Sequence, residues 1–417
     1  MLQKRLVYIT LFTIFFIAVG AVSVIAENQN PESCVNCHEG AARDWERGSK
    51  SEFMLCVDCH GEAHTGPGDA HLVEVPTPKD CAVCHPQEVE RFEEGKHAFA
   101  WEAMLAVPTF QDMPKAATDK GCVLCHQIGY EWDDGSRGRC DSCHSRHVFS
   151  AEEAREPESC GHCHTGDHPQ YEMWQSSKHG MIYAIEQDPE RAPTCVTCHM
   201  PEGDHFVMTA WGFLGVRGEE PYAEWEADRE KILYALNEMG PARAPEVMRE
   251  TMGEWEELRA EMIDICSQCH ATSYAQRDLE KSDALLREAD RVNAQIVDLT
   301  NQFYEEGLID ERTRFNTFRD ATANRFATYM GAFHNSPLYA WDKGFLALTS
   351  DMVYLRDDLI QEKKLDIFGG KIKQSLFLGG TALVIAVAGL LAFTVVTVKR
   401  KKKEEGSSNE KEKHDDN

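Results

Sequence analysis

The sequence has no cysteine to spare for a disulfide bond, because each of its 16 cysteines belongs to a Cys-x-x-Cys-His motif. It also lacks an excess of basic residues: 43 Lys and Arg stand against 70 Asp and Glu, a formal net charge of -27. The first absence excludes a disulfide scaffold, and the second argues against a nucleic-acid-binding protein. The 417 residues are enough for two or three domains.

The Cys-x-x-Cys-His motif occurs eight times and is the attachment signal for haem c. Two thiols bond to the porphyrin, and the adjacent histidine reaches the iron from one face as the proximal ligand. A zinc site would need two Cys-x-x-Cys pairs for each metal, and nothing would demand a histidine after each pair. We therefore expect eight covalently attached c-type haems. The cysteines are Cys34, Cys37, Cys56, Cys59, Cys81, Cys84, Cys122, Cys125, Cys140, Cys143, Cys160, Cys163, Cys195, Cys198, Cys266 and Cys269, and the proximal histidines are His38, His60, His85, His126, His144, His164, His199 and His270.

Apolar runs lie near both ends of the chain. Lys4 and Arg5 precede a run that ends at Ala26, so residues 1–26 predict a signal peptide or an N-terminal anchor. Residues 375–398 carry no charge and are long enough to cross a bilayer. The basic cluster that follows, within the charged tail 399–417, predicts that this end is cytoplasmic. We expect the residues between the two runs to lie on the periplasmic, outer side of the cell membrane.

The motifs crowd into the first half of the chain. Seven of the eight lie in residues 27–205, which leaves little room for a polypeptide core, so the haems are expected to form it. We predict a mainly α-helical protein with an octahaem cytochrome c domain (27–270), a C-terminal helical domain (271–370) and a transmembrane helix (375–398).

Apolar residues of the helical domain recur in steps of three and four, from Leu285 to Phe303 and from Phe315 to Phe333. Gly307 and Pro337 mark the breaks, and a third helix is expected from about residue 339. Such seams indicate packing within the chain or, as the alternative, between subunits.

Removing the eight proximal histidines from the total of 18 leaves ten. His162 lies between the two cysteines of its own motif and His414 lies in the charged tail, so neither is expected to bind iron. Eight remain as candidate distal ligands. If all eight bind, every iron is six-coordinate and the protein is an electron conduit; if one does not, one iron is open. The eight are His64, His71, His97, His147, His168, His179, His205 and His334.

His168 differs from the other candidates in its surroundings. It follows His164 by only four residues, between Asp167 and Pro169, which makes ligation of the neighbouring iron awkward. An Asp-His pair titrates near neutral pH and can move protons. Asp167 can also cap a helix that begins at Pro169, and both roles can hold together.

A short pattern, an aromatic residue and then Lys-His, precedes two of the other candidates, His97 and His179. The segment Asp44–Lys50 resembles it, with Ser51 taken as the residue in place of histidine.

The segments CHTGDHPQYEMWQSSKHG and PTCVTCHMPEGDHFVMTAWGF resemble the octahaem hydroxylamine oxidoreductase family, which includes hydrazine dehydrogenase. The resemblance covers about residues 34–270, together with MGAFHNSP around His334. It implies a five-coordinate catalytic haem on His126, attached through Cys122 and Cys125. Asp167 and His168 match the family's distal-pocket pair, and Tyr234 corresponds to its distal tyrosine by region alone.

The resemblance also implies seven haems with two histidine ligands each. Their distal ligands are then His64, His71, His97, His147, His179, His205 and His334. Family members form homotrimers, and in the oxidising members a tyrosine of a neighbouring subunit is linked to the catalytic porphyrin. Tyr329, Tyr339 and Tyr354 lie in the corresponding region, outside any matching motif.

We therefore expect an oxidoreductase that acts on a small inorganic nitrogen compound: hydroxylamine, nitrite or nitric oxide. Electrons would pass to or from the membrane quinone pool or a cytochrome partner, in a direction that the motifs leave open. A non-catalytic electron conduit and a sulfur-oxyanion reductase are the alternatives.

Overall fold

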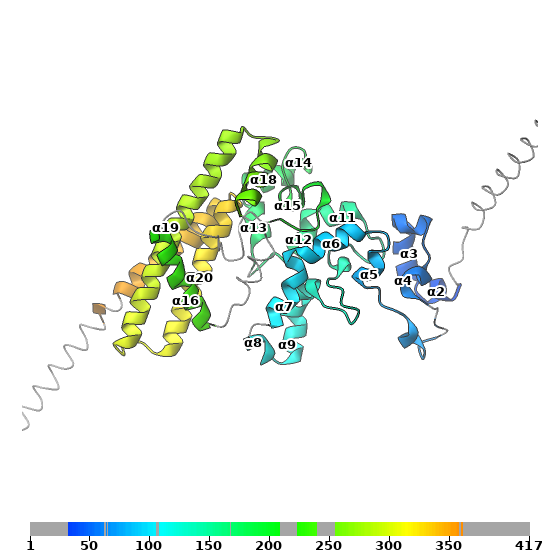
Figure 1. Ribbon diagram of the computed structural model, residues 1–417, viewed down its shortest axis with the longest axis horizontal. Helices are drawn as coiled ribbons and strands as arrows, with labels where there is room; N and C mark the ends of the chain where they lie inside the picture. Colours follow the sequence, from blue (N-terminus) through cyan, green and yellow to red (C-terminus); the bar gives the residue numbers. More distant parts are fainter. Residues whose placement is uncertain are drawn as a thin grey trace, which may run out of the picture. The chain divides into compact units, whose positions relative to one another are not determined.

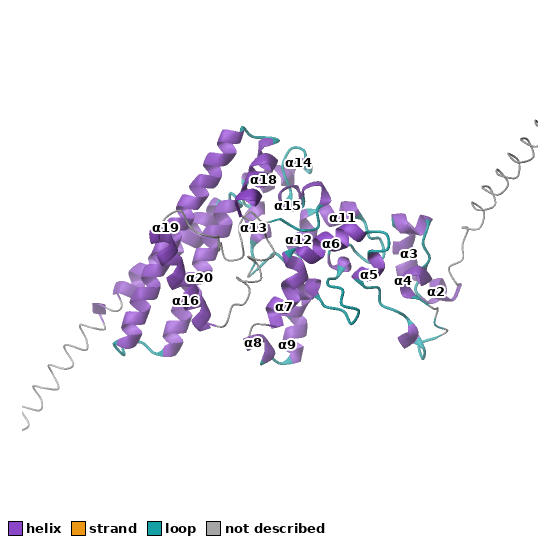
Figure 2. Cartoon of the chain, in the orientation of Figure 1, coloured by secondary structure: helices purple, strands orange, loops and turns teal. Residues whose placement is uncertain are grey.

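The computed structural model describes residues 32–61, 64, 66–105, 108–166, 168–208, 223–239, 255–357 and 360–361. Helices dominate these ranges, as predicted, and they contain no β-strand, only an isolated bridge between Glu131 and Arg137 (Figure 2). Within them, no helix is both long and apolar enough to cross a membrane. Residues 1–26 and 375–398, the two apolar runs, lie outside the described residues.

Backbone contacts divide the chain into two compact units. The first comprises residues 1–298 and 315–351 and contains all eight motifs; the second comprises residues 299–314 and 352–417. In the second unit, the Arg314 side chain donates from Nε to Oδ1 of Asn301 at 2.9 Å and lies over the Tyr304 ring, which ties together the turn between two long helices.

Short helices carry the motifs in the first half of unit 1 (Figure 1). They are interrupted by glycine, proline and the motif histidines, so few exceed two turns. These elements are α2 (Glu32–Cys37), α3 (Glu39–Arg47), η1 (Ser49–Glu52), α4 (Cys56–His60), η2 (Ala70–Leu72), α5 (Pro78–Cys81), α6 (Pro86–Glu94), η3 (Lys96–Phe99), α7 (Ala100–Leu105), α8 (Pro108–Gln111), α9 (Lys115–Lys120), α10 (Cys122–His126), η4 (Gln127–Gly129), η5 (Cys140–Ser142), α11 (Ala151–Arg155), α12 (Pro157–Gly161), α13 (Gln170–Gln175), α14 (Lys178–Glu186), α15 (Cys195–His199) and η6 (Pro201–Gly203).

Longer helices follow the seventh motif. They are α16 (Ala223–Met239), α18 (Trp255–Ser267), α19 (Thr272–Glu305), α20 (Glu311–Phe333) and the π-helix η8 (Leu338–Leu346). The predicted apolar seams are confirmed within unit 1, where Ala289, Val292 and Ile296 of α19 are buried, as are Phe318 and Tyr329 of α20.

One apolar cluster joins three of these helices. Trp225 of α16, Leu286 of α19 and Tyr329 of α20 form it, and Met262 of α18 packs against its edge. Gly307 has φ = +71°, the left-handed conformation that ends α19. The helices after residue 222 therefore have an ordinary side-chain core of their own.

Candidate haem-binding sites

Several motifs fold as one helical turn. In α4, α10 and α15 the helix begins at the first cysteine and ends at the histidine. Residues i, i+3 and i+4 of a helix share a face, so both thiols and the imidazole of a motif project to the same side. This is the arrangement that one porphyrin needs, with two attachment points and one axial ligand. All 16 cysteines are free of disulfides, as predicted.

Hydrogen bonds hold several of the imidazole rings by Nδ1. His60 bonds the carbonyl of Glu74 at 2.9 Å and His126 that of Ala100 at 3.1 Å. The bond to a carbonyl makes Nδ1 the protonated nitrogen and leaves Nε2 to bind a metal. The same arrangement occurs at His64 with Gly66, His144 with Ser150, His199 with Met208 and His334 with Met330.

Seven of the eight proximal histidines lie opposite a second histidine. Metal–imidazole bonds are about 2 Å long, so two imidazoles on either side of one metal have ring centroids about 6 Å apart. The centroid separations fall at that value: His38–His64 5.9 Å, His60–His147 6.0 Å, His97–His164 6.1 Å, His126–His168 6.3 Å, His144–His205 6.3 Å, His179–His270 6.1 Å and His199–His334 6.1 Å.

Burial keeps the deepest of these rings neutral. Desolvation, with His164 facing it, lowers the pKa of His97 to about 4, and desolvation beside His199 lowers the pKa of His334 to about 4. A neutral imidazole is the form that binds iron, so the donor set fits c-type haem.

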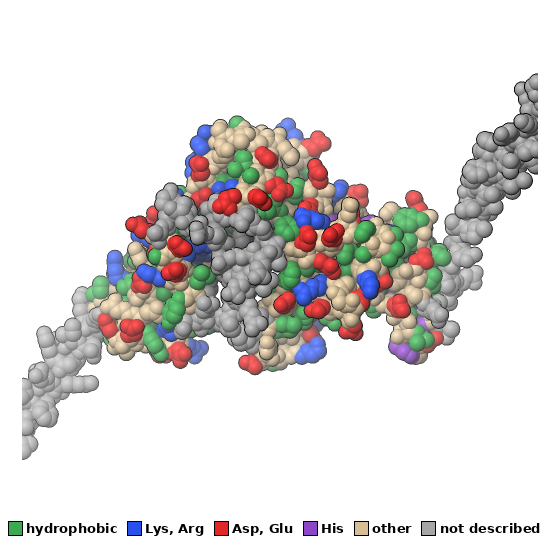
Figure 3. Space-filling view, in the orientation of Figure 1, with side chains coloured by type: hydrophobic (Ala, Val, Ile, Leu, Met, Phe, Trp, Pro, Cys, Tyr) green, Lys and Arg blue, Asp and Glu red, His purple; other side chains and the backbone are tan. Residues whose placement is uncertain are grey.

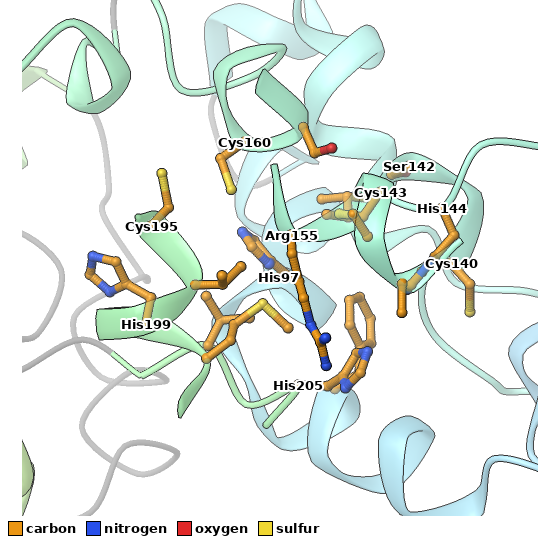
Figure 4. A pocket seen from close by; sticks show the side chains of 18 of the residues that line it. His97, Cys140, Ser142, Cys143, His144, Arg155, Cys160, Cys195, His199 and His205 are labelled. Carbon is orange, nitrogen blue, oxygen red and sulfur yellow. The ribbon is translucent and has the colours of Figure 1, made fainter. Parts of the chain in front are cut away.

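The paired histidines and 13 of the 16 motif cysteines, all but Cys37, Cys122 and Cys269, line one cavity of about 3950 Å³. A pocket for a single small ligand measures about 300–1,000 Å³, so this space suits several large groups. Figure 4 shows part of it, where His97, His199 and His205 surround a hollow together with cysteines of three motifs.

Neighbouring thiols connect the motifs into one succession. Cys81 lies close to Cys140, and Cys160 lies close to Cys195. Such contacts would place the edges of successive porphyrins side by side, which is what electron transfer along the cavity requires. The pairs within contact or electrostatic reach are Cys34–Cys56, Cys59–Cys81, Cys81–Cys140, Cys143–Cys160, Cys160–Cys195 and Cys198–Cys266, and Cys125–Cys163 adds the fourth motif as a branch at the sixth.

The residues predicted for the catalytic centre are placed in part. His168 faces His126 across 6.3 Å, and both line the cavity. Asp167 lies outside the described residues. Tyr234, on α16, is 49% exposed and is not among the residues that line the cavity. Of the three tyrosines considered for a cross-link, Tyr329 lines the cavity, Tyr339 is buried and Tyr354 is exposed.

Six of the seven predicted distal ligands lie opposite a proximal histidine. The seventh, His71, is exposed on η2, and the described residues place no proximal histidine ring against it. Instead, His168 completes the set of seven pairs. His85 is the proximal histidine that no described histidine ring faces; its Nδ1 lies 3.9 Å from Glu88. His162 is exposed, as are the motif histidines His38 and His85, so its exclusion as a ligand stays a prediction.

Gln170 is a site residue that the sequence analysis did not identify. Its side-chain oxygen lies 3.3 Å from Nδ1 of His164, and its amide nitrogen donates to Sδ of Met330 at 3.0 Å. It therefore orients a proximal ligand, two residues after His168. The sequence signal for Gln170 was its position in the segment CHTGDHPQYEMWQSSKHG, directly after His168 and Pro169. Lys96 was also missed: burial lowers its pKa to about 7.

The surface charge agrees with the acidic composition. On the described part of the face in Figure 3, Asp and Glu side chains are scattered among Lys and Arg side chains and no continuous basic patch is visible.

Residues 52–316 match the family described as "Seven times multi-haem cytochrome CxxCH". The chain belongs to this multihaem cytochrome c family. The matched residues contain seven of the eight motifs, because the first motif, Cys34 to His38, precedes them. The chain is therefore a helical protein that carries c-type haems on Cys-x-x-Cys-His motifs.

A curated relative is the "Probable nitrite reductase-hydroxylamine oxidoreductase fusion protein" of Kuenenia stuttgartiensis, 27% identical over 319 residues. The alignment covers 69% of this chain and 35% of that protein, so the chain spans about a third of the relative's length. The relationship is distant, and it connects this chain to hydroxylamine oxidoreductase-like proteins.

Two solved structures share the fold. One, a "Hypothetical multiheme protein", has a TM-score of 0.62 and 20% identity, and the match covers 82% of this chain and 97% of that one. The other belongs to the reducing HAO-like protein complex of Kuenenia stuttgartiensis, with a TM-score of 0.61, 22% identity and coverage of 82% and 87%. At these identities the likeness concerns the fold alone.

Proposed function

We propose that this cytochrome is an oxidoreductase for a small inorganic nitrogen compound, namely hydroxylamine, nitrite or nitric oxide. The observation that carries the proposal is the position of His168, which matches the family's distal-pocket pair, opposite His126 on the wall of the haem cavity. The printed name of the curated relative, which joins nitrite reductase to hydroxylamine oxidoreductase, supports the substrate class.

In this proposal eight haems would be attached, and His126 would hold the one that binds the substrate, with no bond from His168 to its iron. Bound there, haem iron supplies the redox chemistry. His168 then holds a proton beside the substrate instead of bonding to the metal. Asp167, adjacent in the chain, orients its imidazole or raises its pKa.

The neighbouring residues serve the same centre indirectly. The fourth motif meets the succession through the contact of Cys125 with Cys163, so electrons would leave or enter by way of the sixth motif. Gln170 fixes the proximal ring of that sixth motif. The histidine that would transfer protons, His168, and the motif through which electrons would pass therefore lie within a few residues of His164.

The membrane setting is part of the proposal. The apolar run 375–398 and the basic residues after it support a haem region on the periplasmic side, which would be anchored at its C-terminal end. The redox partner would be the quinone pool or a cytochrome. A homotrimer is the assembly that the family resemblance implies.

A second function is favoured by the same distance. The centroid separation of His126 and His168 equals that of His144 and His205, at 6.3 Å. If His168 bonds to the metal, the fourth haem is closed like the others, and the protein conducts electrons for a separate enzyme.

The substitution His168→Ala tests the enzymatic proposal, and His162→Ala, an exposed histidine of the same segment, is the matched control. We expect His168→Ala to abolish turnover of hydroxylamine and nitrite while eight haems stay attached, as measured by protein mass. We expect His162→Ala to retain both. Unchanged turnover in His168→Ala would refute the role of His168.

A further inference from the structure

Three segments of unit 1 repeat one structural pattern. The first two are closest: α3 and α6 each have nine residues and begin directly after a proximal histidine, His38 and His85. Each ends at a glycine in extended conformation, Gly48 with φ/ψ of −86°/152° and Gly95 with −86°/166°. A four-residue 3-10 helix follows each glycine, η1 and η3.

An identical backbone hydrogen bond fixes the register of the repeats. Gly48 N–H donates to the Trp45 carbonyl, and Gly95 N–H to the Phe92 carbonyl, both at 3.0 Å. In the third copy Ser177 N–H donates to the Trp174 carbonyl, also at 3.0 Å, and α14 begins after it. The residue two positions after the donor of this hydrogen bond is Lys50 in the first copy, His97 in the second and His179 in the third.

This register corrects the alignment drawn from the sequence. The sequence pattern predicts Ser51 at the position of the histidine. The hydrogen bond from Gly48 N–H to the Trp45 carbonyl instead puts Lys50 at that position. Lys50 and His97 are both the second residue of their 3-10 helix.

The surroundings of the first two copies also match. A Cβ on Gly95 would lie 2.5 Å from the carbonyl oxygen of Phe206, the residue after His205. A Cβ on Gly48 would meet the carbonyl oxygen of Val148, the residue after His147. In both copies the glycine lets the backbone approach a segment that carries a paired histidine. The two copies are therefore equivalent in three dimensions and not only along the chain.

The histidines at this position share a target. His97 follows the third motif and faces the proximal histidine of the sixth, His164; His179 follows the sixth and faces that of the eighth, His270. In each of these two copies, the histidine therefore faces the proximal histidine of a later motif in the succession. Lys50 follows the first motif, and among the described residues no histidine ring faces the proximal histidine of the third motif, His85.

Local contacts place the Lys50 side chain in the same neighbourhood. Lys50 lines the haem cavity, and its Nζ lies 5.2 Å from the centroid of the Phe149 ring. Its charge acts on Cys59, Cys81 and His144, which belong to the third motif or to the two motifs next to it. His85 acts on the same His144, and Lys50 and His85 both line the haem cavity.

His71 is the other candidate partner for His85. His71 is exposed, and the chain just after it is tied to the second motif: Glu74 N–H donates to the His60 carbonyl at 3.0 Å, and the Glu74 carbonyl accepts from His60 Nδ1 at 2.9 Å.

We propose that Nζ of Lys50 is the axial ligand opposite His85 on the haem of the third motif. The amine binds through its lone pair as neutral –NH₂, and its proton passes to solvent. Lysine carries a nitrogen donor on a longer and more flexible side chain than histidine. The succession would then contain one His/Lys haem, between the second and fifth motifs, among His/His haems.

The test uses the full-length, haem-loaded protein and three substitutions: Lys50→His, Lys50→Ala and, as the control, Lys178→Ala. Lys178 is exposed and belongs to the third copy, one position before the ligand position. Low-temperature electron paramagnetic resonance of the oxidised protein and carbon monoxide binding to the reduced protein report axial ligation without any turnover assay.

We expect Lys50→His to convert one low-spin signal into a signal of the His/His type. We expect Lys50→Ala to open one iron, with a new high-spin signal and additional carbon monoxide binding, and Lys178→Ala to leave the wild-type spectrum unchanged. Identical spectra in wild type and Lys50→His would overturn the proposal, and because that variant keeps a ligand at position 50 it remains informative if Lys50→Ala does not fold. Activity at the haem on His126 is not part of this readout, so the two proposals fail independently.

Discussion

The haem region, residues 32–208, and the long helices after residue 222 differ in what forms their buried core. The fully buried large side chains concentrate in the second region, with Leu286, Ile296, Phe318 and Leu348 among them. In the haem region the side chains of this class are Met173, Pro157 and Ser177. The haem region instead provides most of the lining of a cavity of about 3950 Å³, which residues of α18, α19 and α20 complete. One region is built around side chains, and the other requires a cofactor as its core.

The largest expected difference between the regions follows from withholding haem. A chain produced without haem attachment should lose ordered structure in residues 32–208, since short helices gain their stability from packing and the packing partner is missing. The helices α19 and α20 should stay folded on their own apolar seam. Hydrogen exchange resolved by peptide measures this, and equal protection of both regions in the haem-free chain would contradict the comparison.

The helical region depends on a buried ion pair. Arg325 pairs with Asp290, which is fully buried, and Trp225 Nε1 also donates to Asp290 at 2.7 Å. We expect Asp290→Ala to cost about 3–5 kcal/mol, because it leaves a buried arginine without its carboxylate. Denaturant unfolding of the haem-loaded protein, followed by circular dichroism, measures the loss.

Asp298→Ala is the control for that prediction. Asp298 accepts from Lys231 Nζ at 2.7 Å, but both side chains are largely exposed. Its removal should cost about 0–1 kcal/mol. Equal losses for Asp290→Ala and Asp298→Ala would show that burial is not what makes the Asp290 pair important.

A smaller effect is expected in the haem region from Gly95→Ala. The new Cβ would lie 2.5 Å from the Phe206 carbonyl oxygen, so the backbone beside His97 and His205 must shift. Overpacking of this kind costs about 1–3 kcal/mol. We expect a lower thermal midpoint and an altered haem spectrum.

Gly40→Ala is its control, since a Cβ on Gly40 meets nothing within 4 Å. Alanine in place of glycine inside a helix gains about 1 kcal/mol, so α3 should be slightly stabilised. A spectrum altered equally by both substitutions would refute the close approach at Gly95.

The sequence predicted the helical class and the attachment sites because both follow from local patterns. A Cys-x-x-Cys-His motif needs only one helical turn, and the seams of α19 and α20 repeat within single helices. The distal ligands were harder to predict from the sequence, because each distal histidine faces a proximal histidine that is distant from it in the chain. Proximity in sequence argued only against ligation of the adjacent iron by His168, and the resemblance assigned it to the haem on His126; it faces His126, 42 residues earlier.

Position 50 shows that residue identities alone can misalign a structural repeat. The Lys-His dipeptides at 96–97 and 178–179 aligned the lysines, which shifted the first copy by one residue. The backbone hydrogen bonds to Trp45, Phe92 and Trp174 align the donors instead, and they bring Lys50 into the ligand position. That information lies in the fold of the chain and not in the identity of the residues.

The central functional claim is that the haem on His126 has an open position beside His168. The most direct measurement is the spectrum of the oxidised wild-type protein, by electron paramagnetic resonance and visible absorption, before and after addition of hydroxylamine or nitrite. We predict a high-spin component that shifts when either compound is added and that is perturbed in His168→Ala. Fully low-spin haem with no shift would contradict the claim and identify the protein as an electron conduit.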